Sequence, residues 1–157
     1  MTRPDLLAFM RQERYAVQAS TSPAGAAQAA IIGIVVSDEF EVFFDTIATS
    51  RKAVNLRHNP LAAFVIGPAL ANSARTVQFE GVADEPTGPE LELYFRTFPD
   101  GKARQSWPGL IYFRVRPTWI RYSNFAVNPP EIVEYTGGEL QHQTSKGLTA
   151  TFDALEP

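Results

Sequence analysis

Short apolar or alternating stretches, separated by turn residues, occupy most of the first half of the chain. Residues 15–20, 29–36, 40–44 and 61–66 all follow this pattern. Such runs, bounded by glycine, proline or polar residues, are typical of buried or half-buried strands. The polar triplet at residues 37–39 predicts a turn, so we expect residues 29–36 and 40–44 to form a hairpin.

The second half of the chain continues the strand pattern. Residues 75–83 alternate between polar and apolar, which predicts a strand with one face more exposed to solvent than the other. Residues 110–122 predict a long strand and residues 131–135 a last one, whereas residues 99–108 are typical of a loop. Pro117 interrupts the long strand. Because proline cannot donate a ladder hydrogen bond, we expect a bend or an edge position there.

Three segments have helical character, at residues 4–14, 50–58 and 86–98. The second is expected to end before Pro60, since the residue preceding a proline disfavours the helical conformation. Six or seven strands joined mostly by hairpins, with two or three short helices, predict a mainly β fold. Mostly antiparallel strands favour a barrel or a sandwich over a doubly wound sheet.

Length and composition narrow the function classes. A chain of 157 residues suits a single domain over residues 1–157, with a polar tail from about residue 137 that we expect to be loosely ordered. The net charge of −3 argues against nucleic-acid binding, and the lack of cysteine excludes disulfides and thiolate chemistry. Without a signal core or about 18 consecutive apolar residues, we expect no membrane association and a cytoplasmic location.

The predicted helix at residues 50–58 carries an unusual charge at its start. Arg51 and Lys52 lie in its first turn, where the helix dipole favours acidic residues by roughly 0.3–1 kcal/mol each. The hydroxyls of Thr46, Thr49 and Ser50 lie just before them. On this signal alone, the segment is either a solvated helix start with incidental basic residues or an anion site, since free N–H groups at a helix start bind phosphate.

Other signatures of chemistry are absent from the sequence. The two histidines, His58 and His142, lack ligand-like spacing, so we expect no metal site, and His58 suits the negative end of the helix dipole. No Gly-x-Gly-x-x-Gly, no P-loop and no Gly-x-Ser-x-Gly motif occurs. The aromatic residues and arginines between residues 107 and 125 could form a nucleic-acid platform. The negative overall charge favours packing in a core or a subunit interface instead.

The order of these motifs resembles the pyridoxamine 5′-phosphate oxidase-like family of FMN-binding split barrels, over about residues 11–135. The most specific part is the strand at residues 42–46, followed by Ser50-Arg51-Lys52-Ala53 and then by Asn59-Pro60 leading into an apolar strand. The resemblance implies a split β-barrel of six to seven mostly antiparallel strands. It also implies a homodimer with FMN at the subunit interface.

The resemblance also implies roles for individual residues. In the family, the threonine after the strand and the Arg-Lys pair contact the FMN phosphate, roles that carry onto Thr46, Ser50, Arg51 and Lys52. The strand whose backbone lies along the flavin ring corresponds to the segment that contains Ile32, Gly33 and Ile34. The remaining residues of the implied cofactor site are Asp45, Thr76, where the family often has glutamine, and Gln105 and Ser106, in a loop that reaches the partner's flavin.

One departure separates this chain from the vitamin oxidases themselves. They carry a tryptophan two residues past an isoleucine of the last long strand, and the matching position here is Ser123. We therefore expect a relative that is an FMN-dependent oxidoreductase acting on an unidentified small molecule, with no catalytic side chain evident. The alternatives are a deazaflavin (F420)-dependent reductase, a non-catalytic flavin- or haem-binding module, and a cofactor-free dimeric structural protein.

Overall fold

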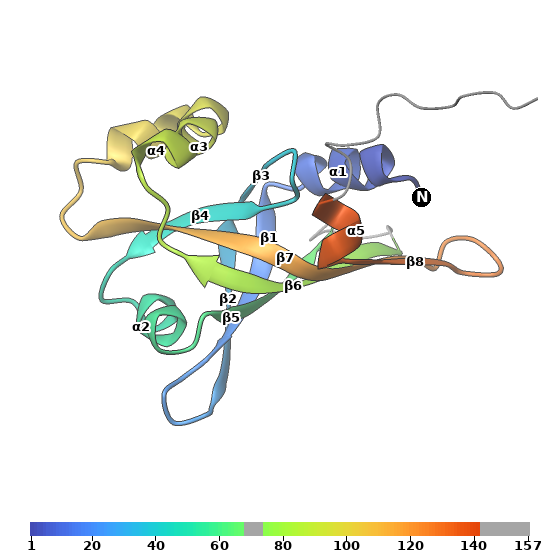
Figure 1. Ribbon diagram of the computed structural model, residues 1–157, viewed down its shortest axis with the longest axis horizontal. Helices are drawn as coiled ribbons and strands as arrows, with labels where there is room; N and C mark the ends of the chain where they lie inside the picture. The colour runs from blue at the N-terminus through green and yellow to red at the C-terminus, as the bar shows by residue number, and fades with distance from the viewer. Residues whose placement is uncertain (68–73, 142–157) are drawn as a thin grey trace, which may run out of the picture.

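The computed structural model describes residues 1–67 and 74–141. Within these residues, eight strands form one antiparallel sheet in the order β2-β1-β5-β6-β7-β4-β3, and β8 pairs with β7 (Figure 1). The strands are β1 (Tyr15–Thr21), β2 (Ala27–Gly33), β3 (Val35–Val36), β4 (Val42–Ile47), β5 (Leu61–Ile66), β6 (Arg75–Asp84), β7 (Leu110–Asn124) and β8 (Glu131–Thr136). The helices are α1 (Arg3–Gln12), α2 (Arg51–His58), the 3₁₀ helix η1 (Gly88–Leu91), α3 (Glu92–Thr97), α4 (Pro99–Arg104) and α5 (Gly137–Gln141).

The connection between β2 and β3 curls the sheet into a half-barrel. These strands lie at opposite ends of the strand order, yet Ile34 alone separates them in the chain. The two edges of the sheet must therefore come close together. The Ile34 N–H donates to the carbonyl of Arg14, 3.0 Å away, which ties this junction to the start of β1. The predicted mainly β split barrel is confirmed, with eight strands instead of six or seven in the described residues.

The core fills the inside of the curled sheet. Phe44 and Phe113 stack with ring centroids 5.5 Å apart, and Phe64 meets Phe79 edge to face at 5.5 Å. Helix α1 covers one end with buried Leu6, Phe9 and Met10. Its start is defined by a capping box between Thr2 and Asp5 and by Pro4 in the first turn.

Several predicted elements have different limits in the structure. The apolar run at residues 29–36 is divided: β2 pairs with β1, and only Val35–Val36 pair with β4 as the expected hairpin. The predicted loop at residues 99–108 was wrong in its first part, where Pro99 begins α4 because its fixed φ suits a first helical turn. The tail expected to be loose from about residue 137 begins with α5, whose Leu140 is buried. Residues 142–157 lie outside the described residues.

Pro117 lies in an irregular part of β7, as predicted, but not on an edge strand. The pairing of β7 with β4 ends at Val115, and its pairing with β8 begins at Trp119. On the other side, the register with β6 shifts between Glu80 and Gly81. A Cβ at Gly81 would lie 2.3 Å from the Arg116 carbonyl oxygen, so this close approach requires glycine. Proline is tolerated here because neither β4 nor β8 needs a hydrogen bond at this point.

Candidate functional site

Hydroxyl groups from β4 and α2 meet at the start of α2. Along β4, Val42, Phe44 and Thr46 point into the barrel, because strand side chains alternate. Ser50 caps α2 by accepting from the Ala53 N–H at 3.3 Å, and the Thr46 Oγ1 and Ser50 Oγ atoms lie 2.9 Å apart. The structure thus brings together the two hydroxyls that were predicted to contact phosphate.

A hollow of about 280 Å³ adjoins the first turn of α2. It is lined by Arg51 and Lys52 of α2, by Gln18 of β1, and by Gln28, Ala29 and Ala30 of β2. Within the described residues, neither Arg51 nor Lys52 forms an ion pair, whereas Arg57 pairs with Glu85, 2.6 Å away. The hollow therefore carries positive charge that the described part of the chain does not neutralise.

Buried amide side chains lie beside the hollow, and one of them, Gln18, lines it. Gln18 is 1% exposed and Asn55 of α2 is 2% exposed. The Asn55 Nδ2 donates to Ser20 Oγ at 3.0 Å and to Gln28 Oε1 at 3.1 Å. The Gln18 Nε2 donates to the carbonyl of Ala19 at 2.7 Å. Because the side chains of Gln18, Gln28, Arg51 and Lys52 line the hollow, it favours a polar occupant.

These amides were not predicted from the sequence, although the pattern of β1 contained a signal. Gln18 alternates with the apolar Val17 and with Ala19, so the usual expectation is that the glutamine faces solvent. The structure has the opposite orientation: Gln18 and Ser20 face inward, and Val17 faces outward and is exposed. A strand with polar residues on its buried face indicates either a ligand or a buried hydrogen-bond network.

The three residues expected along the flavin ring, Ile32, Gly33 and Ile34, do not line the hollow. Ile32 and Ile34 are buried in the core, and Gly33 lies near Phe98 and the Arg14 carbonyl. The segment beside Arg51 and Lys52 is Gln28–Ala30, four residues earlier on average. The reason is that the bulky apolar end of the run fills the core where the sheet curls, which leaves its small polar end beside α2.

Asp45 also lies apart from the residues that were predicted to contact the phosphate. It points to the opposite face of β4 from Thr46, where its Oδ2 accepts from Arg104 Nη2 of α4 at 2.9 Å. Burial, followed by the charge of Asp45, raises the pKa of the adjacent Tyr94 hydroxyl. Asp45 therefore holds α4 against the sheet, and one-residue alternation along β4 explains why it does not join Thr46.

The last three predicted residues lie elsewhere on the surface. Thr76 adjoins Gly67 beside an apolar outer face that contains Tyr15, Val17, Ile31 and Val65. Gln105 and Ser106 are exposed in the segment after α4. None of the three lines the hollow in a single chain. Their roles at a cofactor remain predictions that involve a second subunit.

A larger hollow of about 610 Å³ lies between α1, β3 and α3. It is lined by apolar residues, among them Ile34, Val35, Leu93 and Phe98, and by the charged residues Arg11, Glu13, Arg14 and Asp38. Arg14 lies over the Phe98 ring, 5.0 Å from its centroid, and Arg11 pairs with Asp38 at 2.7 Å. Both arginines at this hollow, Arg11 and Arg14, therefore already have partners within the chain.

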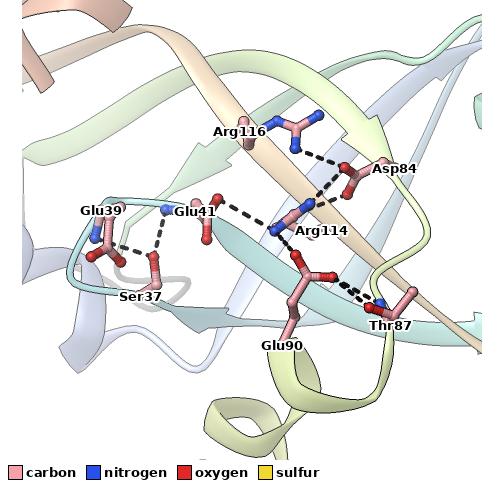
Figure 2. Close-up of polar contacts among 8 residues, drawn as sticks. All are labelled: Ser37, Glu39, Glu41, Asp84, Thr87, Glu90, Arg114 and Arg116. Carbon is pink, nitrogen blue, oxygen red and sulfur yellow. Dashed lines mark hydrogen bonds and ion pairs between the residues drawn. The ribbon is translucent and has the colours of Figure 1, made fainter. Parts of the chain in front are cut away.

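A second concentration of charge surrounds Arg114 in β7 (Figure 2). Its guanidinium donates to both carboxylate oxygens of Asp84, at 3.0 and 2.8 Å, and to Glu90, while Glu41 lies 3.9 Å away. Arg116 also contacts Asp84, at 2.9 Å. The Arg114 hydrogen bond lowers the pKa of Asp84, whereas burial raises the pKa of Glu41. Three carboxylates therefore balance the two arginines, and the cluster joins β6, β7, η1 and the turn before β4.

A family model described as Pyridoxamine 5′-phosphate oxidase matches residues 2–124. No curated protein matches.

Among residues 1–67 and 74–141, no helix is both long and apolar enough to cross a membrane, and no group of three or more potential ligand side chains could hold a metal ion.

Solved structures share the fold at low sequence identity. A heme binding protein from Mycobacterium smegmatis has a TM-score of 0.74 at 15% identity, with 89% of this chain and 60% of that chain covered. General Stress Protein 26 from Bacillus anthracis has a TM-score of 0.64 at 18% identity, covering 85% of this chain and 98% of that one. An F420 reductase has a TM-score of 0.57 at 19% identity, with 72% and 93% covered. The chain thus spans less than two thirds of the first of these proteins.

Proposed function

Because the chain belongs to the pyridoxamine 5′-phosphate oxidase family, we propose that it is a flavin-dependent oxidoreductase that binds the phosphate of FMN at the start of α2. The observation that carries this proposal is the basic pair Arg51 and Lys52, which lines a hollow and meets no carboxylate in the described residues. A dianionic phosphate there would accept charge-assisted hydrogen bonds from both side chains. It would also interact favourably with the positive end of the α2 dipole.

The residues of the hollow fit part of this cofactor. A volume of about 280 Å³ is close to the lower end of ligand pockets, roughly 300 Å³. It suits the phosphate and the adjoining chain. Ala29 and Ala30 of the edge strand β2 leave its backbone open to a flat ring. The rest of the ring would then need a wall from another subunit.

A homodimer would supply that wall, and the outer face of the sheet supports this part of the proposal. Ile31, Val17 and Val65 lie opposite one another on β2, β1 and β5. All three are exposed, Ile31 at 72%, and Tyr15 lies nearby. Contiguous exposed apolar side chains of this kind commonly mark protein–protein contacts. Gln105 and Ser106 are the residues we propose to reach the partner's cofactor.

FMN, when bound, supplies the hydride and electron transfer. The chain's own residues would hold and orient it: Thr46 and Ser50 would offer hydroxyls, and Arg51 and Lys52 would neutralise the phosphate. No side chain at the hollow is a carboxylate or a histidine that could act as an acid or a base. The substrate is therefore proposed only as a small molecule that exchanges a hydride with the flavin.

The two other cofactors fit the described residues less well. The longer anionic tail of a deazaflavin such as F420 calls for further cations near Arg51. Arg57 instead pairs with Glu85, Arg104 pairs with Asp45, and Arg75 lies over the Phe9 ring, 5.3 Å from its centroid. For haem, His58 is exposed at the far end of α2, and the hollow offers no nitrogen ligand.

The proposal is tested by a visible spectrum of freshly purified protein and mass spectrometry of the released ligand, followed by titration with FMN, F420 and haem in turn. We expect a flavin spectrum, or tight saturable uptake of FMN by the apoprotein. Stronger binding of F420 would replace FMN as the cofactor, and the absence of any flavin binding would overturn the proposal. Oxidation of a reduced nicotinamide with an artificial acceptor then separates an enzyme from an inert flavin-binding module.

A further inference from the structure

We propose that Gln18 and Gln28 form a subsite for the hydroxylated chain that links the phosphate to the ring of the cofactor. This inference rests on the proposed function and assigns a role to side chains outside the predicted cofactor site. The hollow presents three kinds of surface: the cations Arg51 and Lys52, the two amides, and the small residues Ala29 and Ala30. These match a phosphate, a polyol and a flat ring respectively.

The strand register places the two amides on the same inner face. Ser20 lies opposite Gln28, and Gln18 lies opposite Ala30, in the antiparallel pair β1–β2. Because side chains two residues apart share a face, Gln18 and Ser20 point inward together, as do Gln28 and Ala30. Gln18 is 1% exposed and still lines the hollow, so it is shielded from bulk solvent beside the space proposed for the ligand.

The hydrogen bonds already present determine what each amide can offer. Gln28 uses its Oε1 to accept from Asn55 Nδ2 at 3.1 Å, so within the described residues its Nε2 is left as a donor. Gln18 uses its Nε2 to donate to the Ala19 carbonyl at 2.7 Å, so in the described part of the chain its Oε1 is left as an acceptor. A hydroxyl group both donates and accepts. One donor and one acceptor within a single hollow therefore suit neighbouring hydroxyls of a polyol.

Asn55 is a positioning residue for this subsite. Its Nδ2 bridges Ser20 Oγ and Gln28 Oε1, and this contact determines which end of the Gln28 amide faces the hollow. Asn55 does not itself line the hollow. A purely apolar ligand would leave the free ends of Gln18 and Gln28 without partners, which is costly in a buried site.

Three flavins separate the parts of the ligand: FMN, riboflavin, which lacks the phosphate, and lumiflavin, which carries a methyl group in place of the polyol chain. Each is titrated against the full-length wild-type protein and the variants Gln18→Leu and Gln28→Leu, by the change in flavin fluorescence. Each variant is expected to weaken FMN and riboflavin about tenfold, the value of one hydrogen bond of ~1.4 kcal/mol, and to leave lumiflavin unchanged. Gln12→Leu, on the exposed end of α1, is the matched control and should change none of the three affinities.

The outcomes distinguish this inference from the proposed function. If wild-type protein binds FMN but both glutamine variants bind riboflavin normally, the polyol subsite is wrong and the cofactor assignment stands. An equal loss of lumiflavin affinity would also overturn the subsite, because the effect would then not depend on the chain. If the wild-type protein binds no flavin, both proposals fail. Thermal unfolding of each variant shows whether it is folded, and half-exposed Gln28 provides the test if buried Gln18→Leu does not fold.

Discussion

Arg114 in β7 contacts the carboxylates of Asp84 and Glu90 and lies near that of Glu41. By contrast, Arg51 and Lys52 at the start of α2 contact no carboxylate in the described residues. Both clusters place cations beside strands of the same sheet. The Arg114 side chain is 14% exposed, and its charge is balanced within the fold. The basic pair adjoins a hollow and remains unbalanced. The difference indicates that the first cluster stabilises the protein and that the second is available to a ligand.

The largest expected effect is on cofactor binding by the double variant Arg51→Ala, Lys52→Ala. Loss of two charge-assisted hydrogen bonds should weaken FMN at least about a hundredfold, roughly 3 kcal/mol, and should leave riboflavin affinity unchanged. Removing positive charge from a helix start should also stabilise the apoprotein slightly, by about 0.3–1 kcal/mol per residue. Fluorescence titration and thermal unfolding measure the two effects.

Arg57→Ala is the control for that variant, because it removes a cation from the same helix at a site already paired with Glu85. It should bind FMN normally. If the double variant keeps wild-type FMN affinity, the unbalanced pair is not a phosphate site. The lack of a carboxylate partner would then not distinguish a ligand-binding cation from a structural one.

The opposite behaviour is expected of Arg114→Ala. Removing the central cation leaves Asp84, Glu41 and Glu90 without their shared partner in a partly buried site, which should lower the free energy of unfolding by about 3 kcal/mol. Denaturation in urea measures the loss, and FMN affinity of the folded variant should be unchanged. A neutral effect on stability would mean that the carboxylates do not depend on Arg114.

Asn55→Ala should combine both effects, because Asn55 is buried and orients Gln28 beside the basic pair. It removes the donor for Ser20 and Gln28, which should cost about 2 kcal/mol of stability. We also expect weaker riboflavin binding through the misplaced Gln28. Unchanged riboflavin affinity in a destabilised variant would limit Asn55 to a structural role.

Acid should weaken the Arg114 cluster through Asp84. The hydrogen bond from Arg114 lowers the pKa of Asp84 from its ordinary value of 3.8, so the stabilisation is present above that value and is lost as the pH falls below it. The stability difference between wild type and Asp84→Asn, measured by urea denaturation, should therefore shrink from pH 7 to pH 3. A constant difference would show that protonation of Asp84 does not contribute.

The smallest effect is expected at Glu41, and it has the opposite sign. Burial raises the pKa of Glu41 above its ordinary value of 4.5, because the charged form loses hydration that Arg114, 3.9 Å away, does not restore. Its contribution is therefore most favourable below that value and is lost as the pH rises through the raised pKa. Glu41→Gln should be more stable than wild type at pH 7, by less than about 1 kcal/mol, with no advantage at pH 4. Lower stability at pH 7 would contradict this assignment.

Local sequence patterns predicted much of the fold and the positively charged part of the candidate site. The strand periods at residues 61–66 and 75–83 and the helix that ends before Pro60 appear in the structure at nearly the expected limits. Thr46, Ser50, Arg51 and Lys52 lie together because they belong to one strand, one turn and one helix, close in the sequence. Neighbouring residues and chain geometry are sufficient to bring such a group together.

The sequence by itself therefore determined most of the elements, the helix cap and the position of the basic pair, since these depend on residues a few positions apart. Only the tertiary structure decided which segment faces that pair. The pairing of β1 with both β2 and β5 turns Gln18 inward and Val17 outward, and it places Gln28–Ala30 instead of Ile32–Ile34 beside α2. Likewise, the packing of α4 against β4 gave Asp45 an arginine partner. A shift of one residue in a strand exchanges its two faces, and an alternating sequence pattern does not say which face is buried. Long-range strand pairing decides this.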